Sequence, residues 1–236
     1  MMKKIAMTLC LVGATFLSKA DLVADWNFNQ TPAAPSPTPI AASGGAEAGA
    51  ASLDLSHLAY SFDATIGSSS SGTSVNKIAN DETGESIFIV GGTGDVENGK
   101  SIIFTLSMSG YQGLVLTYAT DRTSTGFNQQ AWSYSTDGGI TFNPSSSITS
   151  ITNGFTTATV NFSSAVDNDS SVLIELTLNG ASSSSGSDHF DNMQFNANDY
   201  FFPVPESAAY GLISALGLLA ICSASIWRWQ RAARRA

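Results

Sequence analysis

Alternation of apolar and polar side chains with a period of two is the feature that most limits the fold of this chain. It is clearest in residues 102–108, IIFTLSM, where every second side chain is large and apolar. A period of two is typical of a half-buried β-strand. No segment before Glu206 shows the 3.6-residue period of an amphipathic helix. The alternation therefore predicts an all-β fold.

Similar short runs, rich in Val, Ile, Phe, Thr and Tyr, recur along the middle of the chain and are separated by Gly, Ser, Asn and Asp. They are residues 22–29, 86–92, 113–121, 130–136, 155–163, 171–179 and 189–195. Many short strands separated by turn residues are typical of a β-sandwich or jelly roll. We therefore expect a single jelly-roll-like β-sandwich ectodomain over residues 21–202.

Three segments of low complexity are predicted to be loops. Residues 31–51 are rich in Pro, Ala and Gly, which favours a flexible loop or linker after the first strand. Residues 68–71 and 182–185 are polyserine. Serine-rich stretches are typical of flexible surface loops.

The first 20 residues have the three parts of a secretory signal peptide. Lys3 and Lys4 give a basic start, residues 5–17 carry no charge, and Ser18 and Ala20 are small residues at the two positions that signal peptidase recognises. We expect cleavage after Ala20 and export across the inner membrane. An uncleaved anchor is the alternative, although the apolar segment is short for a membrane span.

Residues 208–227 contain no charge. A helix of this length rises about 1.5 Å per residue and spans about 30 Å, the thickness of the bilayer core. Four arginines follow it: Arg228, Arg231, Arg234 and Arg235. Because such a basic cluster stays in the cytoplasm, we predict a transmembrane helix with residues 21–207 outside. A helix buried in a protein core is the alternative, but it would not explain the arginines.

Residues 203–236 resemble the C-terminal sorting signal of the PEP-CTERM surface proteins of Gram-negative bacteria. Val204, Pro205 and Glu206 precede the apolar helix and the basic cluster, and Ser207 stands where the motif usually has a second Pro. The resemblance implies processing by an exosortase, transient membrane anchoring, a final location at the cell surface or outside the cell, and an association with exopolysaccharide and biofilm. Segments 24–29, 116–142 and 189–195 also resemble jelly-roll-like ectodomains that precede such tails, and no defined activity follows from them.

Charge and cysteine content limit the partners of the ectodomain. The chain carries a net charge of −9, but the part between Asp21 and Glu206 contains all 19 acidic residues and only three basic ones, which gives −16. Those three are Lys77, Lys100 and Arg122. Such a surface repels nucleic acid and anionic lipid. Both cysteines lie in the terminal segments, so the ectodomain must fold on a hydrophobic core without disulfides.

Aromatic side chains make carbohydrate binding the alternative function, because sugar rings stack on Trp and Tyr. Trp132 and Tyr134 share one face of a predicted strand. A core-facing strand produces the same pattern, so a structural role stays open for both. Arg122 is a candidate to donate hydrogen bonds to a ligand, or to pair with Asp121 or Asp137.

Residues 187–192, SDHFDN, combine a histidine with two carboxylates. Strict alternation places four side chains on one face of this strand: His189, Asp191, Met193 and Phe195. Since the first and last strands of jelly rolls are often neighbours, Asp25 is expected to approach Asp191 or Asn192 and form a structural Ca²⁺ site. The alternative is that Asp191 only caps a turn or bonds the adjacent backbone. No other cofactor is predicted.

Residues 135–142, STDGGITF, fit the Asp-box pattern and predict a hairpin whose turn is bonded by Asp137. The sequence contains no GxSxG and no HExxH motif, and it has no Cys nucleophile outside the terminal segments. We therefore expect an exported, non-enzymatic cell-surface or extracellular-matrix protein associated with exopolysaccharide. A carbohydrate-binding module is the alternative, and a carboxylate-dependent polysaccharide hydrolase is a third hypothesis, since two catalytic carboxylates would not be singled out by sequence.

Overall fold

The computed structural model describes residues 20–29, 39–59 and 64–200, with the side chains of residues 64–70 left aside. The predicted signal peptide, the sorting motif at Val204–Glu206, the apolar segment 208–227 and the arginine cluster lie outside the described residues. Within the described ranges, no helix combines the length and the apolar character that a bilayer crossing requires.

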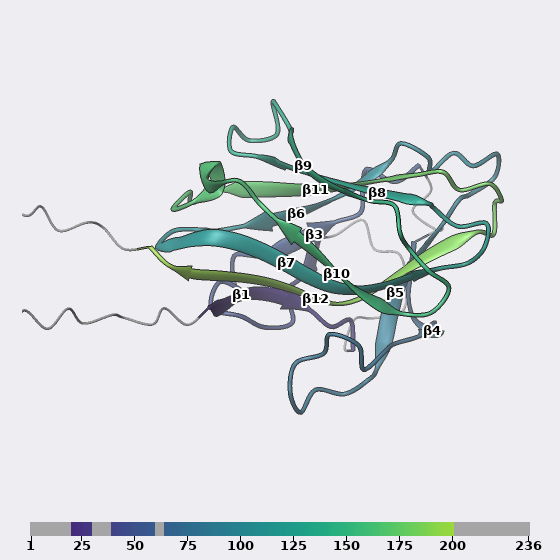
Figure 1. Ribbon diagram of the computed structural model, residues 1–236, viewed down its shortest axis with the longest axis horizontal. Helices are drawn as coiled ribbons and strands as arrows, with labels where there is room; N and C mark the ends of the chain where they lie inside the picture. The colour runs from purple at the N-terminus through teal and green to yellow at the C-terminus, as the bar shows by residue number, and fades with distance from the viewer. Residues whose placement is uncertain (1–19, 30–38, 60–63, 201–236) are drawn as a thin grey trace, which may run out of the picture. The chain divides into compact units, whose positions relative to one another are not determined.

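The described chain forms two antiparallel sheets that lie as two layers (Figure 1). Sheet A contains β1 (Asp21–Trp26), β4 (Ala64–Ser71), β5 (Glu85–Val90), β7 (Tyr111–Arg122), β10 (Thr156–Asn161) and β12 (Ser187–Asp199). Sheet B contains β2 (Ile40–Ala41), β3 (Ser52–Asp54), β6 (Ser101–Leu106), β8 (Gln129–Ser135), β9 (Asn143–Ile148) and β11 (Val172–Asn179). One short 3₁₀ turn, Ser164–Val166, precedes β11. The predicted all-β sandwich is confirmed.

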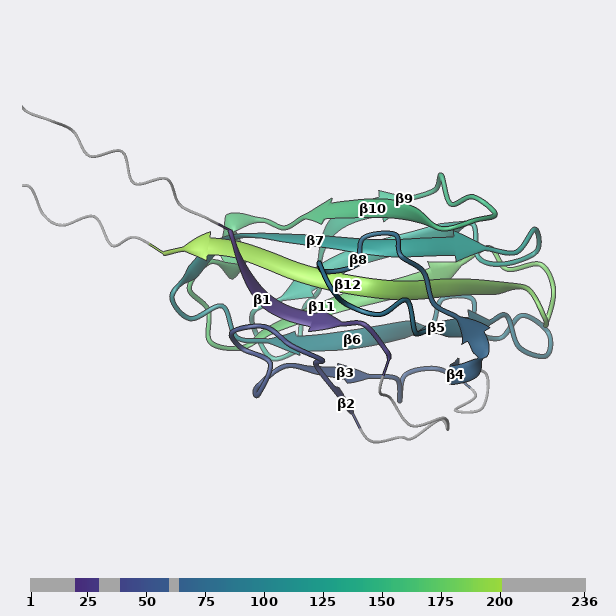
Figure 2. The same cartoon turned by 90° about the horizontal axis from the view of Figure 1, so that it is seen from below.

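The long strand β12 organises sheet A. One of its edges pairs with β7, and the other pairs with β5 along its first half and with β1 along its second half. Figure 2 shows β12 with β7 on one side and β1 and β5 on the other. The order of sheet A is β10-β7-β12-β5-β4, and that of sheet B is β2-β3-β6-β11-β8-β9. The chain passes repeatedly from one sheet to the other, as in a jelly roll.

The core lies between the sheets and follows directly from the period-two pattern. Trp26 packs edge-on against Phe104 of sheet B at 5.1 Å between ring centroids, and against Phe195 of sheet A at 5.8 Å. All three rings are fully buried. Aromatic pairs in these geometries are worth about 0.5–1.5 kcal/mol beyond their buried area. A cysteine-free domain is thus held together by interdigitated apolar side chains.

The low-complexity segments are only partly loops. Residues 40–51 of the predicted loop 31–51 are fixed to the sandwich, because β2 pairs with β3 and Asp25 forms an isolated bridge with Gly44. The prediction of a loop at residues 68–71 is wrong, since these serines end β4. The second polyserine segment, residues 182–185, does lie in the turn between β11 and β12. Serine contributes no apolar alternation, so its strands leave no period-two signal.

A β-bulge corrects the predicted faces of the last strand. Asn192 has φ 48°, in the left-handed region that Asn tolerates better than most residues, and the pairing of β12 with β7 shifts between Asp191 and Gln194. Phe190 therefore faces the core together with Met193 and Phe195, whereas Asp191 lies on the opposite side of the strand. Strict alternation had grouped Asp191 with Met193 and Phe195. The extra residue of the bulge reverses that assignment.

Candidate functional site

Trp132 and Tyr134, the rings that the sequence offered for stacking, belong to the core. Trp132 is 1% exposed and Tyr134 is 8% exposed. The Trp132 indole stacks on Phe104 at 6.1 Å and meets Tyr118 edge-on at 5.3 Å. A ring enclosed on both faces has no surface left for a sugar. Both residues therefore have the core role, which was one of the two roles that the sequence allowed.

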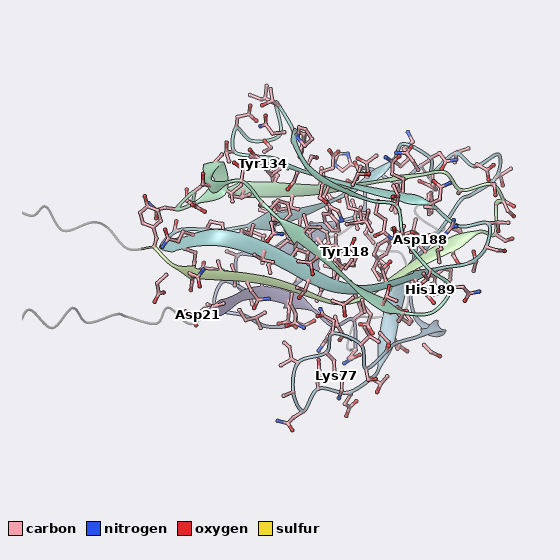
Figure 3. The ribbon with its side chains drawn as sticks, viewed as in Figure 1. Asp21, Lys77, Tyr118, Tyr134, Asp188 and His189 are labelled. Carbon is pink, nitrogen blue, oxygen red and sulfur yellow. The ribbon has the colours of Figure 1, made fainter. Side chains whose placement is uncertain are left out.

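A buried chain of hydrogen bonds runs from this ring into the sandwich. Trp132 Nε1 donates to Tyr118 Oη at 3.0 Å, and Tyr118 Oη donates to Gln130 Oε1 at 2.7 Å. Gln130 Nε2 in turn donates to Thr120 Oγ1 and to Asp188 Oδ2, both at 2.9 Å. Figure 3 labels two members of this chain, Tyr118 and Asp188. Such networks fix one core arrangement when their members are satisfied.

Asp188 is the carboxylate of this network and is fully buried. Burial raises its pKa from 3.8 to about 7, although the hydrogen bond from Gln130 and the nearby Arg122 charge lower it. A methyl group at Gly126 would lie 2.9 Å from Asp188 Oδ1, so the loop that precedes β8 closes tightly over the carboxylate. The Asp188 side chain faces the interior of the sandwich, so its role is structural and it is not exposed to a ligand.

Arg122 fastens two loops to the end of β7. Its Nε donates to the carbonyl of Ile151 at 3.1 Å, and its Nη1 donates to the carbonyl of Gly126 at 3.2 Å. Among the described residues it forms no ion pair with Asp121 or Asp137, which corrects the predicted pairing. Backbone carbonyls are its partners because both loops return to the same end of β7.

The Asp-box hairpin forms as predicted between β8 and β9. Asp137 accepts a hydrogen bond from Ser135 Oγ at 2.7 Å and bonds from the backbone and hydroxyl of Thr141 at 3.0 and 2.6 Å. Gly138 and Gly139 have φ 74° and 86°, which only glycine adopts without strain. The bonds from Thr141 hold the pKa of Asp137 down, at about 2. Every contact of Asp137 described here belongs to the turn.

The strand-neighbour part of the calcium prediction is confirmed, because β1 pairs with β12. Asp191 accepts hydrogen bonds from the backbone N–H groups of Thr73 at 2.8 Å and Asn192 at 2.7 Å. Asn192 Nδ2 donates to the carbonyls of Thr73 and Val75 at 2.8 and 2.9 Å. These bonds fasten the β4–β5 loop, which carries Lys77 in Figure 3, onto the outer side of β12. Asp191 therefore bonds the adjacent backbone at Asn192, which is the alternative that the sequence offered to a Ca²⁺ site.

Asp25 and Asp191 are nevertheless buried carboxylates with a third, Asp81, near both. Burial, reinforced by the charge of Asp81, raises the pKa of Asp25 to about 6. Burial also raises the pKa of Asp191 to about 7, against the lowering effect of its two backbone bonds. In the described ranges no three His, Cys, Asp or Glu side chains converge closely enough to hold a metal ion. A Ca²⁺ site would therefore need carbonyl or amide oxygens beside the two aspartates, which are ligands that Ca²⁺ accepts.

Calcium binding thus stays a prediction, and it has a direct test. A bound divalent cation would remove the cost of burying Asp25 and Asp191 as anions. At a Ca²⁺ concentration one hundred times the Kd, the free energy of unfolding rises by about 2.7 kcal/mol, or roughly 5–10 °C in Tm. We expect EDTA to lower the Tm of the full chain by this amount, and excess Ca²⁺ to restore it.

Asp25→Asn should abolish the response to Ca²⁺, whereas Asp199→Asn, an exposed carboxylate at the end of β12, should keep it. An identical Tm in EDTA and in excess Ca²⁺ would rule out the site. Asp25 and Asp191 would then be protonated over part of the neutral range, as their raised pKa values indicate.

A groove of about 370 Å³ crosses the outer face of sheet B. Its nine lining residues, which we call the hydroxyl groove, are Gln129, Ala131, Trp132, Ser133, Pro144, Ser145, Ser146, Ser147 and Thr177. The pairing register places Thr177 of β11, Ala131 of β8 and Ser147 of β9 in one row across three strands. Ala131, the smallest side chain of this row, leaves the sheet hollow between two hydroxyl groups.

Two side-chain hydrogen bonds lie at the ends of the groove. Gln129 Nε2 donates to Ser147 Oγ at 3.1 Å along one wall. Ser133 Oγ donates to Glu175 Oε2 at 2.9 Å at the other end, so one carboxylate lies beside the groove without lining it. Sequence reasoning missed this site, because small polar residues on the outer face of a sheet carry no recognisable motif. Their side-by-side placement comes from strand pairing alone.

Several solved structures align with parts of this chain at low identity. No family model and no curated protein matches the chain. Among solved structures, the CBM22-1 xylan-binding domain of Paenibacillus barcinonensis Xyn10C aligns over 77% of this chain and 97% of its own at 11% identity and TM-score 0.43. The K1 cleaved adhesin domain of Lys-gingipain from Porphyromonas gingivalis aligns over 74% and 97% at 11% identity and TM-score 0.42.

A third structure, TmCBM61 in complex with β-1,4-galactotriose, aligns over 51% of this chain and 74% of its own at 10% identity and TM-score 0.32. At these values the similarities concern the β-sandwich alone. They identify neither a ligand nor a binding residue of this chain.

Proposed function

We propose that this protein is an exported, non-enzymatic carbohydrate-binding module that holds a neutral polysaccharide in the hydroxyl groove. The groove itself carries the proposal: it has a volume of about 370 Å³, within the range of about 300–1,000 Å³ of ligand sites. Its lining residues come from three strands, β8, β9 and β11. Hydroxyl and amide groups along its walls match the donors and acceptors of sugar hydroxyls.

The charge of the ectodomain supports a neutral ligand. Between Asp21 and Glu206, 19 acidic residues face only three basic ones. The carboxylate of Glu175 lies next to the groove through its bond to Ser133. Like charges placed together oppose binding, so uronic-acid polymers are disfavoured relative to neutral polymers.

A hydrolytic role receives no support at this site. Glycoside hydrolysis uses two carboxyl groups that flank the scissile bond, separated by about 5–9.5 Å. None of the nine residues that line the groove is Asp or Glu. The groove therefore presents binding groups and no acid–base pair.

Export and sorting complete the proposal. The signal peptide, the Val204-Pro205-Glu206 motif and the arginine cluster favour delivery by signal peptidase and an exosortase-type enzyme to the cell surface or its matrix. A module that binds neutral polysaccharide would there attach to exopolysaccharide. Whether the host encodes an exosortase is the observation that decides between processing and a plain C-terminal anchor.

Filling the groove tests the binding function. Ala131→Ile keeps a residue suited to strands and adds three carbon atoms to the floor. Thr177→Val removes one hydroxyl at nearly constant volume. For the full chain in mild detergent, we expect Ala131→Ile to weaken binding to soluble xylan or galactan at least tenfold. We expect Thr177→Val to weaken it about twofold to tenfold, the value of one hydrogen bond.

Thr105→Val is the matched control, because Thr105 lies on β6 of the same sheet, outside the groove lining. Its affinity should equal that of the unmodified protein in affinity electrophoresis or calorimetry. Equal affinities for Ala131→Ile and the control, with equal Tm values, would exclude the groove as the binding site. Tighter binding to alginate than to the neutral polymers would contradict the proposed ligand class.

A further inference from the structure

Four side chains form a row on the outer face of sheet A, on the side of the sandwich opposite the hydroxyl groove. They are Phe88 of β5, His189 of β12, Asp121 of β7 and Phe155, which precedes β10; we call them the histidine row. His189 pairs directly with Phe88 on one side and with Asp121 on the other. The β10–β7 pairing begins at Thr156 and Thr120, so Phe155 follows next in the row.

The outward direction of the row follows from its neighbours. Ile87 and Ile89, which flank Phe88, are buried in the core, and so are Asp188 and Phe190 on either side of His189. Since successive side chains of a strand point to opposite faces, Phe88 and His189 face away from the core. Both are partly exposed, and the His189 side chain retains 27% of its accessible surface. Figure 3 shows His189 beside β12, at the same end of the sandwich as Asp188.

The imidazole is held in place by three neighbours. Its Nδ1 lies 2.7 Å from Asp121 Oδ1, a buried carboxylate oxygen. The Phe88 ring meets the imidazole edge-on at 5.7 Å and 88°. The Phe155 ring is tilted by 32° to the imidazole, with 6.1 Å between the ring centroids. Within the described part of the chain, Nε2 has no hydrogen-bond partner, so a ring nitrogen that can still form a hydrogen bond belongs to an imidazole in contact with two aromatic rings.

This combination suits a sugar ring. The apolar C–H face of a pyranose packs on an aromatic ring, and its equatorial hydroxyls reach polar groups at the rim. Here Phe155 and His189 would provide the aromatic face, His189 Nε2 a nitrogen that can hydrogen-bond a hydroxyl, and Asp121 a carboxylate for one further hydroxyl. Hydroxyl-lined and aromatic surfaces thus lie on opposite sides of one domain.

We propose that the histidine row is a second polysaccharide-binding surface, so that one domain bridges two neutral polysaccharide chains. This inference rests on the proposed function, because the groove supplies the first contact. The two surfaces belong to opposite layers of the sandwich, so one straight chain does not reach both. Two weak contacts on the same protein convert single-chain binding into cross-linking and raise the overall avidity for a polymer network.

Light scattering of the full chain mixed with long soluble xylan tests the bridging. A protein with two sites cross-links the polymer near equivalence and the scattering rises, while a protein with one site decorates the polymer and leaves the scattering low. We expect the unmodified protein to cross-link. Phe155→Ala should abolish the rise in scattering and keep binding within about threefold. Phe155→Tyr, which retains the ring, should cross-link normally.

The groove variant separates this proposal from the function on which it rests. Ala131→Ile should also lose cross-linking but keep weak binding through the row, and the double variant Ala131→Ile/Phe155→Ala should lose binding altogether. Cross-linking by Phe155→Ala at the level of the unmodified protein would overturn the second surface and leave the groove intact. Complete loss of binding in Ala131→Ile alone would also overturn it. Absence of binding by the unmodified protein would overturn both proposals.

Discussion

Trp132→Ala is expected to lower the free energy of unfolding by about 3–5 kcal/mol, the usual cost of deleting a buried Trp. The indole is 1% exposed, stacks on Phe104 and donates to Tyr118 at 3.0 Å. Its removal leaves a cavity and takes a donor away from Tyr118. For a domain of this size the change corresponds to roughly 6–20 °C in Tm. Urea unfolding followed by circular dichroism measures it.

Trp132→Phe is the matched variant, because it keeps an aromatic ring and removes mainly the Nε1 donor. We expect it to cost about 1–3 kcal/mol of the free energy of unfolding. Any loss of binding in Trp132→Ala should follow its loss of folded protein. A Trp132→Ala protein with unchanged stability and no polysaccharide binding would contradict the burial of this ring and restore it as a stacking residue.

Stability is expected to fall as the pH rises from about 4 to about 7. Burial raises the pKa of Asp188 from 3.8 in the unfolded chain to about 7 in the folded one. Between these values the native state holds more protons than the unfolded state, so the free energy of unfolding decreases with increasing pH. The loss from Asp188 alone amounts to at most about 4 kcal/mol. In metal-free buffer, Asp25 and Asp191 also make the free energy of unfolding fall with rising pH, because burial raises their pKa values too.

Asp188→Asn isolates this contribution. Asparagine keeps an acceptor for Gln130 and has no proton to lose, so the variant should be more stable than the unmodified protein at pH 8 and show a flatter profile. Asp137→Asn is the control: the pKa of Asp137 lies low, at about 2, so its titration falls outside the window. Chemical unfolding in EDTA at pH 5 and pH 8 gives the comparison. Parallel profiles for Asp188→Asn and the unmodified protein would contradict the assignment.

The sandwich could be predicted from sequence wherever one face of a strand is apolar. Strands β6, β7 and β11 alternate clearly, and their core-facing residues are buried as expected. Strands β4 and β9 could not be predicted, because their serines give no contrast between faces. The pairing partners that convert such segments into strands lie far away in the chain, and period alone does not reveal them.

The candidate sites were less accessible to sequence reasoning. Alternation identified Trp132 and Tyr134 as facing one side but could not say which side is the core. The bulge at Asn192 changed which residues of β12 share a face. The groove and the histidine row each join residues from three strands, so each appears only when the strand register is known.

Hydrogen–deuterium exchange of the full chain, with and without saturating soluble xylan, tests the central claim most directly. The groove predicts added protection in peptides that cover residues 129–133 and 144–147, on the outer face of sheet B. The second surface predicts weaker protection around residues 155 and 189. Protection confined to other strands, or an unchanged pattern despite measurable binding, would contradict the account of this protein as a groove-binding carbohydrate module.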